Sequence, residues 1–147
     1  MRTNAVTRLA FPYGFFVLIM ACICGSCGHG TYVAVGVTSA PLSLIGVPIG
    51  VSSVKLSAFG YGFALGPFFW KLMGFAATKR DSPRLRLLFP AVAGLHYLSA
   101  IVAVTATGAY SDWEQIPPVL GFFILWLLAY VFGQIGLWRG YLERPRA

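Results

Sequence analysis

The chain has 147 residues, of which 58% are hydrophobic and only 10% are charged, and its formal net charge is +7. Because a soluble domain is about 25% charged, this composition excludes an ordinary water-soluble globule. It also excludes a disordered chain, since disorder requires low hydrophobicity. Apolar runs of about 20 residues indicate an all-α integral membrane protein, because backbone groups in lipid must pair within helices.

Four apolar segments are predicted to form a bundle of four transmembrane helices. They cover residues of about 9–30, 57–78, 87–108 and 119–138. Each is long enough to cross a hydrocarbon core of about 30 Å at 1.5 Å per residue. Lys71 is the only charged residue within them, and we expect its side chain to reach toward the nearer membrane surface.

The apolar stretch 31–56, between the first two spans, is interrupted by glycines and by Pro41 and Pro48. Each proline lacks a backbone donor and breaks a helix interior. Three interpretations are open: a continuation of the first span, an apolar loop outside the membrane, or a re-entrant hairpin. We expect a loop with short extended pieces, because Val, Ile and Ser dominate the stretch. Exposed apolar surface of this kind often marks the docking site of a partner.

The positive charges predict the orientation of the bundle. Nine of the 11 basic residues precede the first span, lie between the second and third, or follow the fourth: Arg2, Arg8, Lys79, Arg80, Arg84, Arg86, Arg139, Arg144 and Arg146. An even number of spans places these regions on one side, which the positive-inside rule makes cytoplasmic. We therefore expect a multi-pass protein of a plasma or inner membrane with both termini in the cytoplasm. Because this topology accounts for the net positive charge, we expect no nucleic-acid partner.

Three cysteines lie close together near the end of the first span. Cys24 and Cys27 are three residues apart, so their thiols would share one face of a helix, and His29 could join them as a further metal ligand. Such a pair can capture a soft metal ion or cycle through a disulfide. Cysteine is also a small apolar residue, and this run of small residues equally suits close helix packing.

The first 22 residues also have features of a cleaved lipoprotein signal. Two arginines precede an apolar stretch, and a small residue comes directly before Cys22. Cleavage there would leave three spans and a lipid-modified Cys22 outside the cell. Met20 is not a favoured residue at such a site, so we expect an uncleaved first helix.

His96 is the ionisable group that we expect deepest in the membrane, about 14 Å into the third span. It could relay protons, ligate a metal or a haem, or serve a quinone. A bis-histidine haem would require His29 at the same depth as His96, which depends on where the first span begins. The alternative is a neutral imidazole that hydrogen-bonds to a neighbouring helix. No cofactor is firmly implied.

Two further features concern packing and transport. All four acidic residues lie outside the predicted spans, which disfavours a proton- or sodium-coupled carrier. We expect Gln134 to hydrogen-bond between helices, and Gly62 and Gly66 to form a G-x-x-x-G pair that permits close helix approach.

The sequence contains no phosphate-binding loop, zinc-protease motif or serine-hydrolase elbow. We therefore expect a non-catalytic membrane protein that acts through partners in the bilayer, as an accessory subunit or a homo-oligomer. The first alternative is soft-metal transport or thiol redox chemistry at Cys24 and Cys27. The second is a subunit that anchors haem or quinone through His96.

Overall fold

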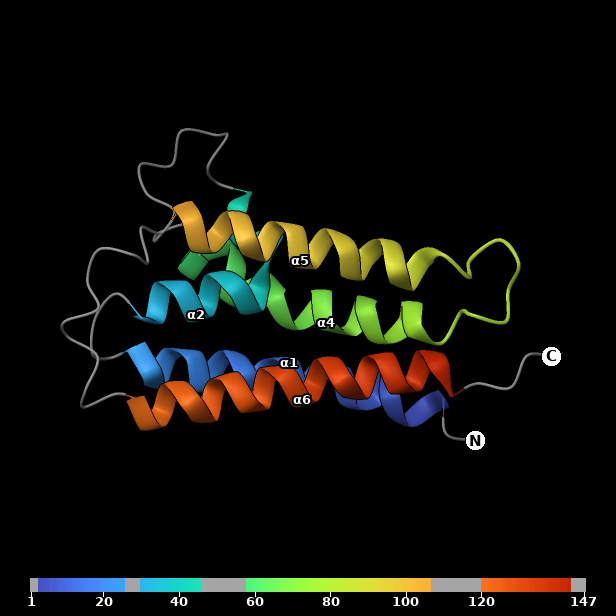
Figure 1. Cartoon of the computed structure of the whole chain (residues 1–147), viewed down its shortest axis with the longest axis horizontal. Helices are drawn as coiled ribbons and strands as arrows, with labels where there is room; N and C mark the ends of the chain where they lie inside the picture. Colours follow the sequence, from blue (N-terminus) through green and yellow to red (C-terminus); the bar gives the residue numbers. More distant parts are fainter. Residues whose placement is uncertain (1–2, 26–29, 46–57, 107–119, 144–147) are drawn as a thin grey trace.

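The structure, a computed structural model, describes residues 3–25, 30–45, 58–106 and 120–143. These residues form helices and turns, and no strand occurs among them. The all-α class that we predicted from composition is therefore confirmed for the described part of the chain. Long helices run side by side, with one short helix beside half of their length (Figure 1).

Four of the helical segments correspond to the four apolar segments of the sequence. They are α1 (Thr3–Gly25), α4 (Ala64–Ala77), α5 (Leu88–Ala106) and α6 (Leu120–Leu142). The π-helix η2 (Ala58–Phe63) leads directly into α4 and lengthens that segment. α1 packs against α4 and α6, while α5 packs against α4. Long apolar runs favour this arrangement because helices pair all their backbone groups internally.

The segment that we expected to be an outer loop contains a buried helix. α2 (Gly30–Ser39) and the short 3-10 helix η1 (Leu42–Leu44) lie against the longer helices. Val35 and Thr38 are both fully buried. The expectation of a surface loop with extended pieces is wrong for these residues, because a backbone among apolar helices must pair its own polar groups. Residues 46–56 of the predicted loop lie outside the described residues.

Glycines allow these helices to approach closely. A Cβ atom on Gly66 would lie 2.8 Å from Cδ1 of Leu18 on α1 and 3.0 Å from Cβ of Ser39 on α2. A Cβ atom on Gly62 would meet the Ser39 hydroxyl. The predicted role of this G-x-x-x-G pair in helix packing is therefore confirmed, with α1 and α2 as the partners of η2 and α4.

The outer faces of the bundle carry large apolar side chains. Phe16 on α1 and Phe68 on α4 are 51% and 59% exposed. Leu98 on α5 and Phe132 on α6 are 68% and 64% exposed. Among the described residues, one helical stretch is long and apolar enough to cross a membrane alone, Leu88–Thr105 in α5, while the apolar part of α1 is shorter. This gives weak support to membrane association.

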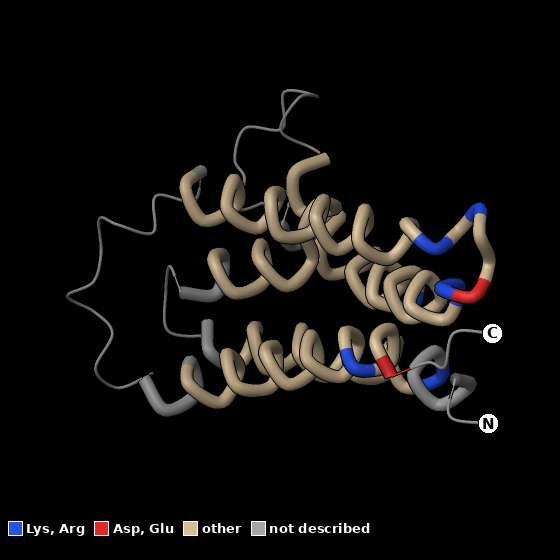
Figure 2. The backbone as a smooth tube through the Cα atoms, turned by 45° about the vertical axis from the view of Figure 1, so that its right-hand side comes forward, with Lys and Arg blue, Asp and Glu red and all other residues tan. Residues whose placement is uncertain are grey.

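Most of the charged residues that the structure describes lie toward one end of the bundle, where α1 begins and α6 ends (Figure 2). The hairpin between α4 and α5 lies at the same end and is joined to α6 by hydrogen bonds. The guanidinium group of Arg80 donates to the carbonyl oxygens of Tyr141 at 3.0 Å and Leu142 at 2.6 Å. The Tyr141 hydroxyl donates to the carbonyl oxygen of Arg86 at 3.0 Å.

Candidate functional site

His96 lies on α5 with none of its surface exposed. Its Nδ1 atom is 2.7 Å from the carbonyl oxygen of Ala40, just past the end of α2. Its Nε2 atom is 2.7 Å from the hydroxyl of Tyr130 on α6. Because a carbonyl oxygen only accepts, Nδ1 carries the proton and Nε2 of the neutral ring accepts from Tyr130. His96 thus joins three separate parts of the chain.

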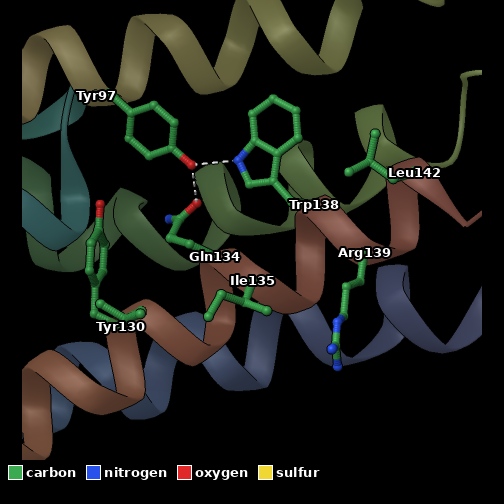
Figure 3. A pocket seen from close by; sticks show the side chains of 8 residues that line it. Tyr97, Tyr130, Gln134, Ile135, Trp138, Arg139 and Leu142 are labelled. Atoms are coloured by element: carbon green, nitrogen blue, oxygen red, sulfur yellow. Dashed lines mark hydrogen bonds between the residues drawn. The ribbon is translucent and has the colours of Figure 1, made fainter.

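A chain of hydrogen bonds continues from His96 along α6. The Nε2 atom of Gln134 lies 3.4 Å from Nε2 of His96. The Tyr97 hydroxyl donates to Oε1 of Gln134 at 3.1 Å, and the indole nitrogen of Trp138 donates to that hydroxyl at 2.7 Å (Figure 3). Tyr130, Gln134 and Trp138 share one face of α6 because they are spaced four residues apart. Gln134 therefore bonds between helices, as we predicted.

A second polar cluster surrounds the end of α2. The last carbonyl groups of any helix have no partner within it. Here the indole nitrogen of Trp70 on α4 donates to the Thr38 carbonyl oxygen at 2.9 Å, and the Ser43 hydroxyl donates to the Gly36 carbonyl oxygen at 2.8 Å. The indole nitrogen of Trp126 on α6 donates to the Thr38 hydroxyl, also at 2.9 Å. Side chains of α4 and α6 thus hold α2 inside the bundle.

Sequence reasoning did not find this second cluster. The signal that could have revealed it is the presence of Trp70 and Trp126 within apolar segments, because a buried indole N–H requires an acceptor. Thr38 was also overlooked, since the stretch around it was interpreted as a loop. The acceptors come from α2, which is far from both tryptophans in the sequence, so no local spacing connects them.

A groove lies on the outside of the bundle next to the polar chain. It has a volume of about 490 Å³ and is lined by Tyr97 on α5 and by residues of α6 between Tyr130 and Leu142 (Figure 3). The surface that it presents is apolar, and the polar atoms of Tyr97 and Gln134 are bonded to one another. Arg139 lies at its edge, toward the end of α6.

The predicted haem ligand has both of its ring nitrogens engaged. An axial bond from Nε2 of His96 to iron would replace the hydrogen bond from Tyr130. This geometry fits the structural interpretation of His96, in which the ring connects neighbouring helices. The part of the chain that the structure describes contains no group of three or more His, Cys, Asp and Glu side chains that could hold a metal ion.

The predicted thiol site falls mostly outside the described residues. Cys27 and His29 are not described, and of Cys24 only the backbone, in α1, is described. Cys22 lies in α1, half-buried and with a free thiol. Metal capture or thiol exchange at Cys24 and Cys27, and lipid modification of Cys22, therefore stay predictions.

Comparisons with known proteins add no information about the function. No protein-family model, no curated protein and no solved structure matches the chain.

Proposed function

We propose that this chain is a multi-pass membrane protein that acts through a protein partner, as an accessory subunit or as a homo-oligomer. In the proposal, α1, η2 with α4, α5 and α6 cross the bilayer and both termini lie in the cytoplasm. The observation that carries it is the exposure of large apolar side chains on all four long helices, from Phe16 on α1 to Phe132 on α6. Lipid or another apolar helix covers such side chains far better than water does.

The charged end supports the proposed orientation. A membrane protein keeps Lys and Arg predominantly on the cytoplasmic side. Most of the described basic residues lie where α1 begins, α6 ends and the hairpin between α4 and α5 lies (Figure 2), while Lys71 lies within α4. An arrangement with one basic end and apolar sides suits a bundle that stands across a bilayer.

The hydrogen-bonded interior supports action through a partner. His96 and Gln134 are buried and bonded to other side chains of the bundle. Polar groups paired in this way stabilise the contacts between helices. In the described part of the chain, the outer faces of the helices are left free to bind a protein partner. A second transmembrane chain would make its contacts there.

Photo-crosslinking in native membranes tests this proposal. A photoreactive amino acid is placed at an outward position on each long helix: Phe16, Phe68, Leu98 or Phe132. The matched control carries it at Ala93, which is fully buried on the same helix as Leu98. We expect at least one outward position to give an adduct larger than the monomer, while Ala93 gives none. Mass spectrometry of the adduct then distinguishes self-association from a different subunit.

Two results would contradict the proposal. If every outward position gave only monomer crosslinked to lipid, the chain would have no stable partner in its membrane. If the chain remained in solution after the cells were broken without detergent, the membrane part of the proposal would be wrong as well.

A further inference from the structure

The groove beside α6 has the shape and the surface chemistry of a site for a hydrocarbon chain. Its volume is about 490 Å³, and it is a shallow groove rather than an enclosed ligand pocket. It is open along the outside of the bundle, where lipid would lie in the proposed membrane protein. Val131 and Ile135 line it together with the ring of Tyr97.

The polar atoms below the groove do not need a hydrogen-bond partner from a bound molecule. The Tyr97 hydroxyl accepts from Trp138 and donates to Gln134, so its proton and one of its acceptor positions are used within the protein. The deeper part of the groove therefore offers ring faces and aliphatic carbon. This surface favours a hydrocarbon chain over the polar ring of a quinone.

The end of the groove that lies toward the end of α6 is basic rather than apolar. Arg139 is exposed at its edge, one turn beyond Ile135 on α6. This is the end of the bundle at which the charged residues gather. A guanidinium group binds phosphate oxygens in a bidentate manner, and Trp side chains such as that of Trp138 prefer the membrane interface.

We infer that this groove binds a negatively charged phospholipid, with one acyl chain against Val131 and Ile135 and the phosphate paired with Arg139. An occupant of the groove needs a long apolar part near the middle of the bundle and an anionic group at its basic end. A phospholipid in the cytoplasmic leaflet satisfies both conditions, and its negative charge complements the basic end. The inference rests on the proposed membrane location.

Native mass spectrometry of the full chain in mild detergent tests the inference. The protein is titrated with phosphatidylglycerol or with phosphatidylcholine of identical acyl chains. We expect phosphatidylglycerol to be retained preferentially, and Arg139→Gln to reduce this preference about fivefold, as loss of one direct ion pair with the lipid predicts. Ile135→Trp, which fills the groove, should reduce the retention of both lipids. Val131→Trp is a second filling variant if Ile135→Trp does not fold.

Two controls separate the groove from general effects. Arg84→Gln removes an exposed cation from the hairpin between α4 and α5, and Leu98→Trp enlarges an exposed side chain on α5; neither residue lines the groove. Both should bind lipid as the unaltered chain does. Equal retention of the two lipids would overturn the inference, and so would an equal loss with Arg84→Gln and Arg139→Gln. If the lipid inference failed in this way, the chain would still require detergent to stay in solution. If the proposed membrane location were wrong, the chain would stay in solution without detergent, so the two failures can be distinguished.

Discussion

At the scale of single residues, the hydroxyl group of Tyr130 completes the bonding of a fully buried His96. Tyr130→Phe would leave the Nε2 atom of His96 without its close donor inside the bundle. We expect the free energy of unfolding to fall by about 1 kcal/mol, since hydrogen bonds between membrane helices are modest and a lost buried partner costs more. Unfolding of the purified protein in mixed micelles, followed by circular dichroism, measures this change.

Tyr61→Phe is the matched control for this measurement. Tyr61 lies on η2 and is 41% exposed, so removal of its hydroxyl should change the unfolding free energy by less than about 0.5 kcal/mol. If both variants behaved alike, the Tyr130 hydroxyl would not be a significant support for His96.

His96 and Gln134 show what can be predicted of a buried site from one sequence. Both are polar groups inside apolar segments, so the need for hydrogen-bond partners on other helices was predictable. Their actual partners were not, because Tyr130 and Ala40 meet His96 only through the rotation of α6 and the position at which α2 ends. Neither of these follows from residue spacing along one segment.

At the scale of elements, α6 approaches α1 and α4 at a glycine. A Cβ atom on Gly133 would lie 2.8 Å from Cζ3 of Trp70 and would also meet the ring of Tyr13. Gly133→Ala should therefore force these helices apart and lower the unfolding free energy by about 1–3 kcal/mol. Thermal unfolding in detergent, with the midpoint read from circular dichroism, tests this expectation.

Gly136 on the same helix provides the control. A Cβ atom there would meet nothing within 4 Å. Gly136→Ala should be neutral or should stabilise the protein by up to about 1 kcal/mol, because alanine restricts the unfolded chain more than glycine does. An equal loss of stability in both variants would show that helix flexibility, rather than close packing at Gly133, is what matters.

The long helices were easier to predict than the short one. Apolar runs of about 20 residues have few alternatives to a helix when lipid surrounds them. The stretch that forms α2 has the composition of a strand or loop, and its propensity suggested neither a helix nor burial. The surrounding helices determine its structure, because a backbone enclosed by α1 and α5 must satisfy its own hydrogen bonds. Pro41 lies two residues after Ser39, the last residue of α2, and proline disfavours a helical conformation at the residue before it, so the helix ends where Pro41 predicts.

At the scale of the whole molecule, Arg80 connects the hairpin between α4 and α5 to the end of α6. In a membrane, this contact requires the hairpin and the C-terminal end of α6 to lie on one side. We expect Ser82→Cys, in a variant without the native cysteines, to react with a membrane-impermeant maleimide only from the cytoplasmic side. Labelling of intact spheroplasts and of inverted vesicles distinguishes the two sides.

Asp112→Cys is the companion variant, because the charge pattern predicts this residue on the opposite side. It should be labelled in spheroplasts and protected in sealed inverted vesicles. Labelling of both variants from one side would show that α5 does not cross the membrane, and the proposed four-span arrangement would then be wrong.

The bonding of α2 has a consequence for how the protein is made. Besides Ser43 of η1, the donors that meet the end of this short helix belong to Trp70 and His96, and a further indole, from Trp126, reaches the Thr38 hydroxyl. Trp70, His96 and Trp126 leave the ribosome after α2, and Trp126 emerges only with the final helix. A nascent chain interrupted before α6 therefore lacks the donor to the Thr38 hydroxyl, so the hydrogen bonding of α2 is complete only after α6 has been made.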